Sequence, residues 1–196
     1  MATDTRQRMV AAATELFRTR GYDGTGFREV VAQAGAARGA IYHHFPEGKA
    51  ELGAAVVDTI GTYLADAVAE VCASAPPAEA VTVLLDLVDR LLVRHQDTPG
   101  CPLAAVTLAA DDPDHRLRAA TDAVFSRLRD ALTSCLVRDG VPAADAASYA
   151  ALAVAGAEGA VILSRARRDP EPFNQVRRAL LESVDRLPRG TDGRPH

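Results

Sequence analysis

The stretch TGFREVVAQAGAARGAIYHHF, residues 25–45, decides the fold of the chain around it. Its first half carries apolar residues at the spacing of one helix face: Phe27, Val30, Val31 and Ala34. Gly35 follows, at a position where helices often end in a left-handed residue. A second short helix is predicted to start soon after, with Ile41 and Phe45 one turn apart on its buried side. Two short helices joined by a tight turn that contains glycine predict a helix-turn-helix.

The second helix of such a motif lies in the DNA major groove, with its N-terminal residues against the base edges. Its exposed positions here hold donors, aromatic rings and a small residue rather than acids: Arg38, Ala40, Tyr42, His43 and His44. These residues predict binding to double-stranded DNA. The alternative interpretation is a solvated helix face with one aromatic ring packed inward.

Four segments resemble, in their order along the chain, the N-terminal domain of the TetR family of transcriptional repressors: AAATELF at 11–17, GYDGT at 21–25, Ala34-Gly35 and RGAIYHHF at 38–45. The resemblance covers residues 6–55. It implies an all-α fold with a three-helix helix-turn-helix domain. A long helix joins that domain to a helical domain that binds a ligand and forms the dimer.

Two further segments are similar to the LmrA/YxaF-type subgroup of that family. FPEGKAEL at 45–52 is one residue longer than the family's usual F-P-x-K-x-x-L, and GCPLAA occupies 100–105. The chain departs from the family at Gly26 and Ala37, where Ser or Thr usually starts the two motif helices. An alanine in place of a serine cap costs about 1 kcal/mol. We therefore expect Thr25 or a water molecule to cap the first of these helices.

The resemblance also implies a role for single residues. Tyr42 and Lys49 are expected to donate to phosphate oxygens, as hydroxyl and ammonium groups do. Arg38 can bridge O6 and N7 of guanine, and Ala40 can contact a thymine methyl group. The complete set of predicted DNA-binding residues is Thr25, Phe27, Arg28, Arg38, Gly39, Ala40, Tyr42, His43, His44 and Lys49.

The net charge of −4 is unevenly distributed along the 196 residues. Residues 1–53 hold seven Lys/Arg against six Asp/Glu, a balance of +1, and the remainder holds 15 against 20, a balance of −5. An acidic body suppresses indiscriminate binding to DNA, while the small N-terminal domain supplies local positive charge. Specific affinity is therefore expected to depend on dimerisation.

Apolar periodicity predicts about nine helices and no strand. Beyond the two motif helices these are expected at 4–20, 49–73, 78–96, 101–110, 114–138, 143–168 and 171–187. We expect three parts: a helix-turn-helix domain at 1–48, a ligand-binding and dimerisation domain at 49–187, and a flexible tail at 188–196. The helix at 49–73 would span roughly 36 Å, enough to connect the two domains.

Two groups of residues in the larger domain are expected to bind partners. A largely apolar set predicts the wall of an effector pocket: Leu64, Val68, Val88, Leu92, Leu103, Val106, Thr107, Phe125, Leu128 and Glu158. Small residues let helices approach closely, so a second set predicts an interface between two copies related by a two-fold axis: Ala151, Ala155, Gly156, Gly159, Ala160, Phe173, Val176 and Leu180. Packing within one chain is the alternative for that set.

No catalytic constellation, cofactor motif or secretion signal is recognised. The longest apolar run, 150–163, is too short for the 20 or so residues of a membrane span, so no membrane contact is expected. Cys72, Cys101 and Cys135 are odd in number and far apart in the sequence, which suits reduced thiols in a cytoplasmic protein.

Two features have a chemical alternative. Cys101 precedes a helix, where a lowered thiol pKa suits a redox sensor, although a small core residue is the simpler interpretation. The acidic turn of Asp111, Asp112 and Asp114 with His115 resembles metal ligands, but such turns are mostly solvated caps, and no metal is predicted.

Together these patterns predict a homodimeric repressor that binds palindromic operator DNA and is released by a small, largely apolar effector. One alternative is an all-α enzyme or small-molecule-binding protein that does not bind DNA. Another is a repressor that responds to oxidation of Cys101.

Overall fold

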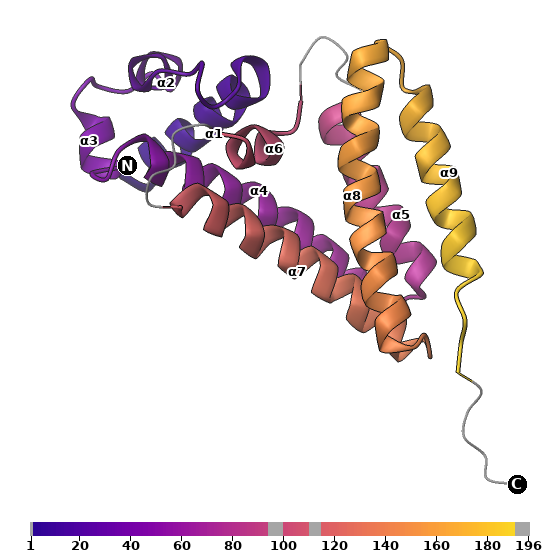
Figure 1. Cartoon of the computed structure of the whole chain (residues 1–196). Helices are drawn as coiled ribbons and strands as arrows, with labels where there is room; N and C mark the ends of the chain where they lie inside the picture. Colours follow the sequence, from indigo (N-terminus) through magenta and orange to yellow (C-terminus); the bar gives the residue numbers. More distant parts are fainter. Residues whose placement is uncertain (1, 94–99, 110–114, 191–196) are drawn as a thin grey trace, which may run out of the picture. The chain divides into compact units, whose positions relative to one another are not determined.

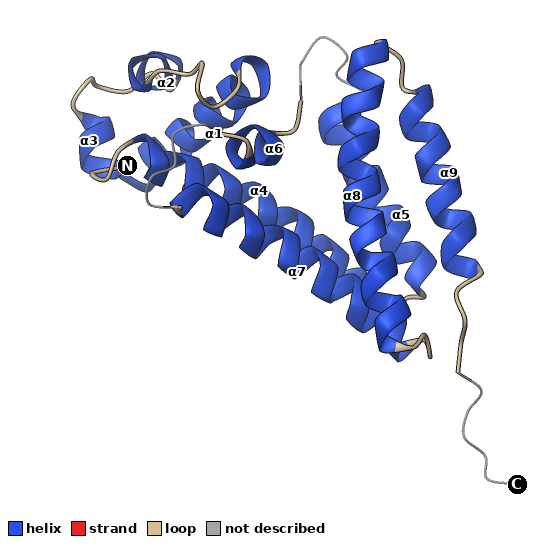
Figure 2. Cartoon of the chain, in the orientation of Figure 1, coloured by secondary structure: helices blue, strands red, loops and turns tan. Residues whose placement is uncertain are grey.

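The computed structural model describes residues 2–93, 100–109 and 115–190, and only the backbone of residues 2 and 3. These residues form nine α-helices, one π-helix and no strand (Figure 2), which confirms the all-α fold. Figure 1 labels the α-helices in chain order, and the π-helix η1 follows α5: α1 (Ala2–Arg20), α2 (Phe27–Gln33), α3 (Ala40–His44), α4 (Lys49–Cys72), α5 (Pro77–Val88), η1 (Asp89–Val93), α6 (Pro102–Thr107), α7 (Arg116–Arg138), α8 (Ala143–Arg167) and α9 (Glu171–Asp185).

The chain divides into two compact units. Unit 1 comprises Met1–Thr62 and Asp97–Val124, and unit 2 comprises Tyr63–Gln96 and Phe125–His196. This division differs from the boundary expected after residue 48, because the first half of α4 belongs to the same unit as α1 to α3. Its apolar residues Leu52 and Val56 are fully buried there.

The core of unit 1 is built on α1. Met9, Ala13 and Phe17 recur every four residues on its inner face and are 0–1% exposed. α2 and α6 both pack against this helix.

α4 and α7 approach each other closely within unit 1. A Cβ atom added to Gly61 would lie 2.1 Å from Cγ2 of Val124. One added to Gly53 would lie 2.8 Å from Cδ2 of Leu117 and 2.9 Å from Cε2 of Tyr22. The numbering rises in the same direction in both helices, so they run parallel here, and glycine at these positions permits the approach.

Unit 2 contains α5, α8 and α9, which pack against one another (Figure 1). The buried hydroxyl of Tyr149 on α8 donates to the carbonyl of Leu180 on α9 at 2.7 Å. Near the other end of α8, Ser164 Oγ accepts the backbone N–H of Phe173 at 3.0 Å. Arg177 on α9 pairs with Asp86 on α5 at 2.6 Å. These contacts hold α9 onto the other two helices.

One helix differs from the sequence prediction in its geometry. A continuous helix was expected at 78–96, but α5 ends at Val88 and a π-helix occupies Asp89–Val93. The wider turn moves the buried position to Val93, 6% exposed, and leaves Leu91 39% exposed. Residues 94–96 lie outside the described residues.

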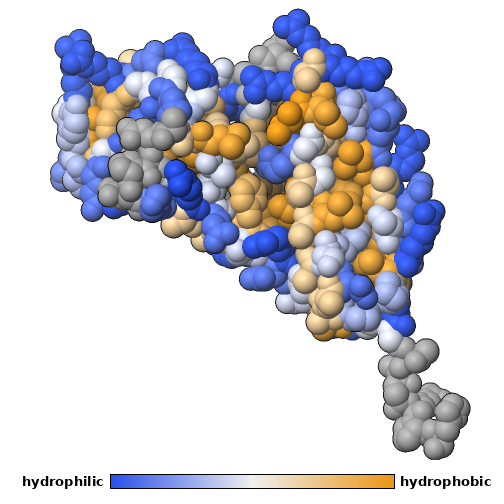
Figure 3. Space-filling view, viewed as in Figure 1, coloured by the Kyte–Doolittle hydropathy of each residue, from blue (hydrophilic) through white to orange (hydrophobic). Residues whose placement is uncertain are grey.

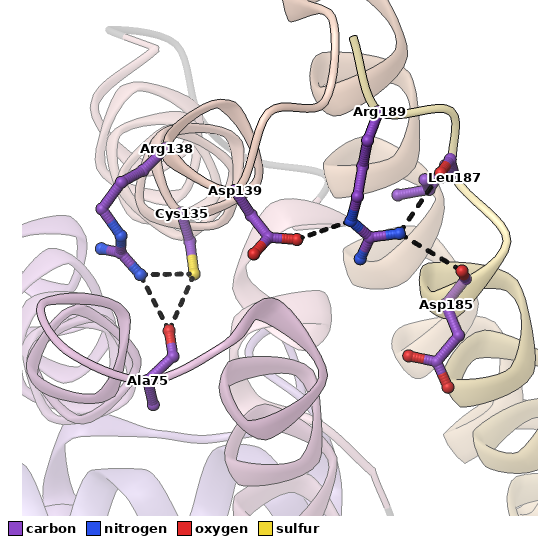
Figure 4. Close-up of polar contacts among 7 residues, drawn as sticks. All are labelled: Ala75, Cys135, Arg138, Asp139, Asp185, Leu187 and Arg189. Atoms are coloured by element: carbon purple, nitrogen blue, oxygen red, sulfur yellow. Dashed lines mark hydrogen bonds and ion pairs between the residues drawn. The ribbon is translucent and has the colours of Figure 1, made fainter. Parts of the chain in front are cut away.

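The segment expected to form a flexible tail is partly held. Arg189 donates to the carboxylate of Asp139 at 2.9 Å and to the carbonyls of Asp185 and Leu187 (Figure 4). The N–H of Gly190 donates to the Gly140 carbonyl at 2.9 Å. Residues 188–190 are therefore docked on the turn after α7, and 191–196 lie outside the described residues.

Among the described residues, two helices are long and apolar enough to cross a membrane by length and composition alone, α4 and α8. Core helices of water-soluble proteins pass the same test. In α4 the apolar residues form the buried face described above, whereas α8 carries apolar residues on its exposed side as well. That exposed side is considered below.

Candidate DNA-binding site

The turn between α1 and α2 depends on two glycines and a buried ring. Gly21 has φ +77°, a conformation that suits glycine, and its N–H donates to the Phe17 carbonyl. A Cβ atom at Gly24 would lie only 2.5 Å from the carbonyl oxygen of Arg20. Tyr22 is 4% exposed and its ring lies 5.1 Å from that of Phe17. These contacts fix the position at which α2 begins.

The start of α2 is capped by Glu29. Its carboxylate accepts the backbone N–H of Gly26 at 3.0 Å and pairs with Arg20 at 2.6 Å. The Gly26 hydrogen bond, followed by Arg20, holds the pKa of Glu29 below its usual value. The prediction that Thr25 caps this helix is wrong: Thr25 is 2% exposed, and its hydroxyl donates to the Gly21 carbonyl at 2.8 Å.

The turn of the motif has the expected geometry. Gly35 lies in the left-handed region at φ +59°, and the Ala36 N–H donates a hydrogen bond to the Val31 carbonyl at 3.1 Å. This is the pattern in which a glycine ends a helix and satisfies its last carbonyls. Arg8 of α1 donates to the Ala34 carbonyl at 3.1 Å, which fixes the turn to the first helix.

α3 is anchored by its two apolar residues. Ile41 is 2% exposed and Phe45 is 0% exposed, as their spacing predicted. The guanidinium of Arg6 lies 5.1 Å above the Phe45 ring. Because one face of this short helix is fixed in the core, its other face is presented at a defined angle.

The outer face of α3 is exposed to solvent. Tyr42 is 65% exposed, and Arg38, Gly39 and His43 are exposed with it. Ala40 and His44 are half-buried, and the rings of His43 and His44 are 5.2 Å apart. Arg38 forms no ion pair or hydrogen bond within the part of the chain that the structure describes, so its five N–H donors face solvent.

A hollow of about 570 Å³ lies between α2 and α3. Its lining combines an apolar floor with aromatic and cationic residues: Phe27, Arg28, Val31, Ala32, Ala36, Arg38, Ile41 and Tyr42. The rings of Phe27 and Tyr42 meet edge to face at 6.1 Å. The two guanidinium groups and the phenol can donate to an anionic backbone, while the apolar floor suits a base edge or methyl group.

Two of the predicted DNA contacts are already engaged inside the unit. The ammonium of Lys49 lies 4.4 Å over the Tyr22 ring and donates to the Asp23 carbonyl at 3.4 Å. The Thr25 hydroxyl is buried, as described above. The structure thus brings Phe27, Arg28 and the α3 residues together on one surface. Thr25 and Lys49 instead contact residues of the turn between α1 and α2.

Sequence reasoning missed Glu29 as the cap of α2. The spacing Gly26-x-x-Glu29 is that of a capping box, so the signal was present. It also missed that Phe27 and Tyr42 form one edge of a hollow, for which a linear sequence carries no signal.

The predicted effector-pocket residues divide between the two units. Leu103, Val106 and Thr107 belong to unit 1, where the Thr107 hydroxyl donates to the Leu103 carbonyl. The other seven belong to unit 2, where Val68 is fully buried and Glu158 is half-buried: Leu64, Val68, Val88, Leu92, Phe125, Leu128 and Glu158. Their joint role in a pocket stays a prediction.

The predicted dimer residues also separate into two groups. Ala160, Phe173 and Leu180 are 1–3% exposed in the core of unit 2, where they cannot face a second copy, and this corrects the prediction for these three. A Cβ atom added to Gly156 would lie 3.5 Å from side-chain atoms of Val176 and Leu180, so this small residue faces α9 within the same chain.

The exposed side of α8 nevertheless carries an apolar stripe, visible as the orange atoms along this helix in Figure 3. Leu152, Ile162 and Leu163 are 55%, 59% and 57% exposed. Together with the exposed or half-buried small residues their spacing follows one helix face: Ala151, Leu152, Ala155, Gly159, Ile162 and Leu163. We call these six residues the α8 stripe. Ala151, Ala155 and Gly159 belong to the interface set predicted from the sequence.

The structure adds little support for a redox sensor at Cys101 or for a metal site at the acidic turn. Cys101 is 7% exposed at the N-terminus of α6. Asp111, Asp112 and Asp114 lie outside the described residues, and His115 is exposed with φ +54°. Among the described residues, no group of three or more His, Cys, Asp or Glu side chains could hold a metal ion.

Comparison with known proteins matches both halves of the chain. Residues 9–56 fit the family model of bacterial regulatory proteins of the tetR family. Residues 77–179 fit the model of the C-terminal domain of LmrA/YxaF-like transcriptional regulators.

Several relatives are similar over nearly the whole length. The helix-turn-helix transcriptional regulator Rv0196 of Mycobacterium tuberculosis is 36% identical over 89% of this chain and 91% of its own length. The regulator LmrA of Bacillus subtilis is 27% identical over 93% and 98%. A crystal structure of a TetR transcriptional regulator from Chloroflexus aurantiacus, 29% identical, covers 97% of this chain and 98% of its own with a TM-score of 0.75. This chain therefore belongs to the TetR family of transcriptional regulators, in its LmrA/YxaF-like group.

Proposed function

We propose that this regulator is a homodimeric repressor that binds a palindromic operator and leaves it when a small, largely apolar effector binds. α3 enters the major groove of each half-site, and the hollow between α2 and α3 faces the DNA. The single observation that carries the proposal is the anchored α3 with its open face of Arg38, Tyr42 and His43.

Arg38 has the most specific role in this proposal. It precedes α3 in the turn at its N-terminus, where a helix in the major groove meets the base edges. A free guanidinium there can form two hydrogen bonds to one guanine. Ala40 follows within reach of a thymine methyl group. Arg28 and Tyr42 flank the hollow and are assigned to phosphates.

The second copy is proposed to cover the α8 stripe. TetR-family regulators typically act as dimers, and six apolar residues on one exposed helix face need a cover. A membrane is the other apolar cover, but the small residues Ala151, Ala155 and Gly159 favour the close approach of a second helix. The two-fold axis would then set α8 against its own copy.

The effector is proposed to bind among the seven predicted pocket residues that belong to unit 2. It can relieve repression only by binding the DNA-free conformation more tightly than the DNA-bound one. Couplings of this kind are typically about 1–3 kcal/mol. The proposed activity needs no cofactor and no catalysis, and it takes place in the cytoplasm, where the operator is.

The binding of DNA can be tested by fluorescence anisotropy with a labelled duplex from the region upstream of the protein's own coding sequence. Binding should weaken steeply with salt, because each neutralised phosphate contributes about 0.9 to the slope of log K against log salt. A duplex that is not retained even at low salt would refute the proposal.

Two arginine variants make the assay specific. Arg28→Ala should weaken binding to every sequence and lower the salt slope by about 1 per protomer, as expected for a lost phosphate contact. Arg186→Ala is the matched control, because Arg186 is also exposed but lies at the end of α9 with a weak pair to Glu182 at 3.4 Å. Equal losses in both variants would show that general charge, rather than this surface, determines binding.

A further inference from the structure

Two cysteines that are distant in the sequence meet in unit 2. Cys72 is the last residue of α4 and Cys135 lies near the end of α7, and they are 6% and 1% exposed. Their thiols are hydrogen-bonding neighbours, and both are reduced. The expectation that the three cysteines lie apart therefore holds for the sequence but not for this pair.

Arg138 fixes the geometry of the pair. Its guanidinium donates to Cys135 Sγ at 3.5 Å and to the Ala75 carbonyl at 2.8 Å, and it also donates to the Cys72 carbonyl. Cys135 Sγ itself lies 3.9 Å from the same Ala75 oxygen. Figure 4 shows the Cys135 sulfur, the Ala75 carbonyl and Arg138 in one triangle. The end of α4 is thus tied to the end of α7 at the point where the two sulfurs meet.

We propose that Cys72 and Cys135 are a site of reversible oxidation, at which a small hydroperoxide converts the two thiols to an intramolecular disulfide. Disulfide formation requires the two residues to lie close together, because sulfurs held apart cannot bond without movement of the backbone. The network of Arg138 supplies that proximity in the folded protein.

The two sulfurs take different roles. The Arg138 guanidinium lies 3.5 Å from Cys135 Sγ, whereas burial and the neighbouring thiol raise the pKa of Cys72 to about 12, so Cys135 is assigned as the sulfur that attacks the peroxide. The Cys135 sulfur attacks the outer oxygen of the hydroperoxide, the O–O bond breaks, and a sulfenic acid and one molecule of alcohol or water result. The Cys72 sulfur then attacks the Cys135 sulfur, and the hydroxyl leaves with the Cys72 proton as water. The two thiols are oxidised by two electrons and the peroxide is reduced by two.

The site is distinct from the sensor considered at Cys101. Cys101 belongs to unit 1 and precedes α6, whereas Cys72 and Cys135 both belong to unit 2. The pair is also independent of the DNA-binding surface, so the failure of either proposal leaves the other intact.

Peptide mapping after oxidation tests the proposal directly. Trypsin places each cysteine on its own peptide, 50–90 for Cys72, 95–116 for Cys101 and 130–138 for Cys135. The folded full-length protein is treated with hydrogen peroxide, free thiols are alkylated, and the peptides are identified by mass spectrometry. The expected product joins 50–90 to 130–138, is lighter than the two thiol peptides by two hydrogen atoms, and disappears after treatment with dithiothreitol.

Three variants separate this product from other oxidation. Cys101→Ser should still form the bond, while Cys72→Ser and Cys135→Ser should each lose it. Circular dichroism before oxidation confirms that each variant is folded. The oxidised protein should melt about 10 °C higher than the reduced protein, because the bond closes a long loop. The proposal is overturned if both thiols remain open to alkylation, if Cys135 ends as a sulfinic acid without a cross-link, if Cys101 takes part, or if the melting temperature falls.

Discussion

The substitution Gly61→Ala tests the packing of α4 on α7 within unit 1. In most helices a glycine-to-alanine change stabilises by about 1 kcal/mol. Here the added Cβ would lie 2.1, 2.6 and 2.9 Å from Cγ2, Cγ1 and Cβ of Val124. Val124 is 1% exposed, and its branched side chain has few rotamers to escape into. Overpacking costs about 1–3 kcal/mol, and so close an approach belongs in the upper part of that range, so after the helix gain we expect a net loss of about 1–2 kcal/mol in the free energy of unfolding.

Urea denaturation followed by circular dichroism measures the loss, at one fixed protein concentration because the proposed dimerisation would make stability depend on concentration. The matched background is Val124→Ala, which removes both Cγ atoms and leaves only the 2.9 Å contact to Cβ. Adding Gly61→Ala to that background should change stability by much less, close to zero, which gives a coupling of about 1–2 kcal/mol. If Gly61→Ala stabilises the unaltered chain by the ordinary amount, α4 and α7 do not pack as described.

Three further predictions follow from single contacts. Tyr149→Phe removes the 2.7 Å hydrogen bond to Leu180 and should lower the free energy of unfolding by about 1 kcal/mol, measured by urea denaturation. Burial, followed by the charge of Asp185, raises the pKa of Tyr149 in the folded protein. The stability that this residue contributes is therefore fully present below the unfolded pKa of about 10 and should decline as the pH rises above it. Tyr149→Phe should flatten that decline, and equal slopes in the two proteins would contradict the assignment. Tyr42→Phe should weaken binding to all duplexes alike in anisotropy titrations, and an altered base preference would contradict a phosphate contact. Ile162→Asp places a charge in the α8 stripe and should shift sedimentation toward the monomer, whereas Ala119→Asp, at an exposed position of α7 outside the stripe, should not; unchanged sedimentation in both would exclude the stripe as the interface.

The local features of the DNA-binding unit were predictable because short-range physics determines them. The spacing of Val30, Val31, Ile41 and Phe45 specified which faces of α2 and α3 are buried, and Gly35 specified the turn. The same periodicity placed most α-helices to within a few residues, because each buries one continuous stripe in the described residues, but it did not predict that α5 ends at Val88.

Features that depend on contacts between distant segments were not predictable. The sequence gives no sign that Cys72 meets Cys135, since that pairing depends on how α4 and α7 align. The small residues of α8 could serve a contact within the chain or between chains, and the structure divides them: Gly156 faces α9, whereas Gly159 has open space around its Cα. The exposure of Leu152 on the same helix became evident only from the packed unit.

Thr25 shows a different reason for failure. Gly26 rather than Thr25 is the N-cap residue of α2, and its N–H donates to Glu29, the third residue of the helix. The carboxylate has the further partner Arg20, while the Thr25 hydroxyl finds the Gly21 carbonyl within its own turn. Thr25 thus lies one residue before the N-cap position, and its hydroxyl is used by the preceding turn.

Selection of duplexes from a random pool by the full-length protein tests the central claim most directly. We predict that sequencing of the retained DNA gives an inverted repeat whose half-sites lie about one helical turn, roughly 34–36 Å, apart. A guanine in each half-site should be lost from the consensus when Arg38→Ala is used in place of the unaltered protein. A retained pool with no common sequence, or a consensus that Arg38→Ala leaves unchanged, would contradict the assignment of α3 as the helix that reads DNA.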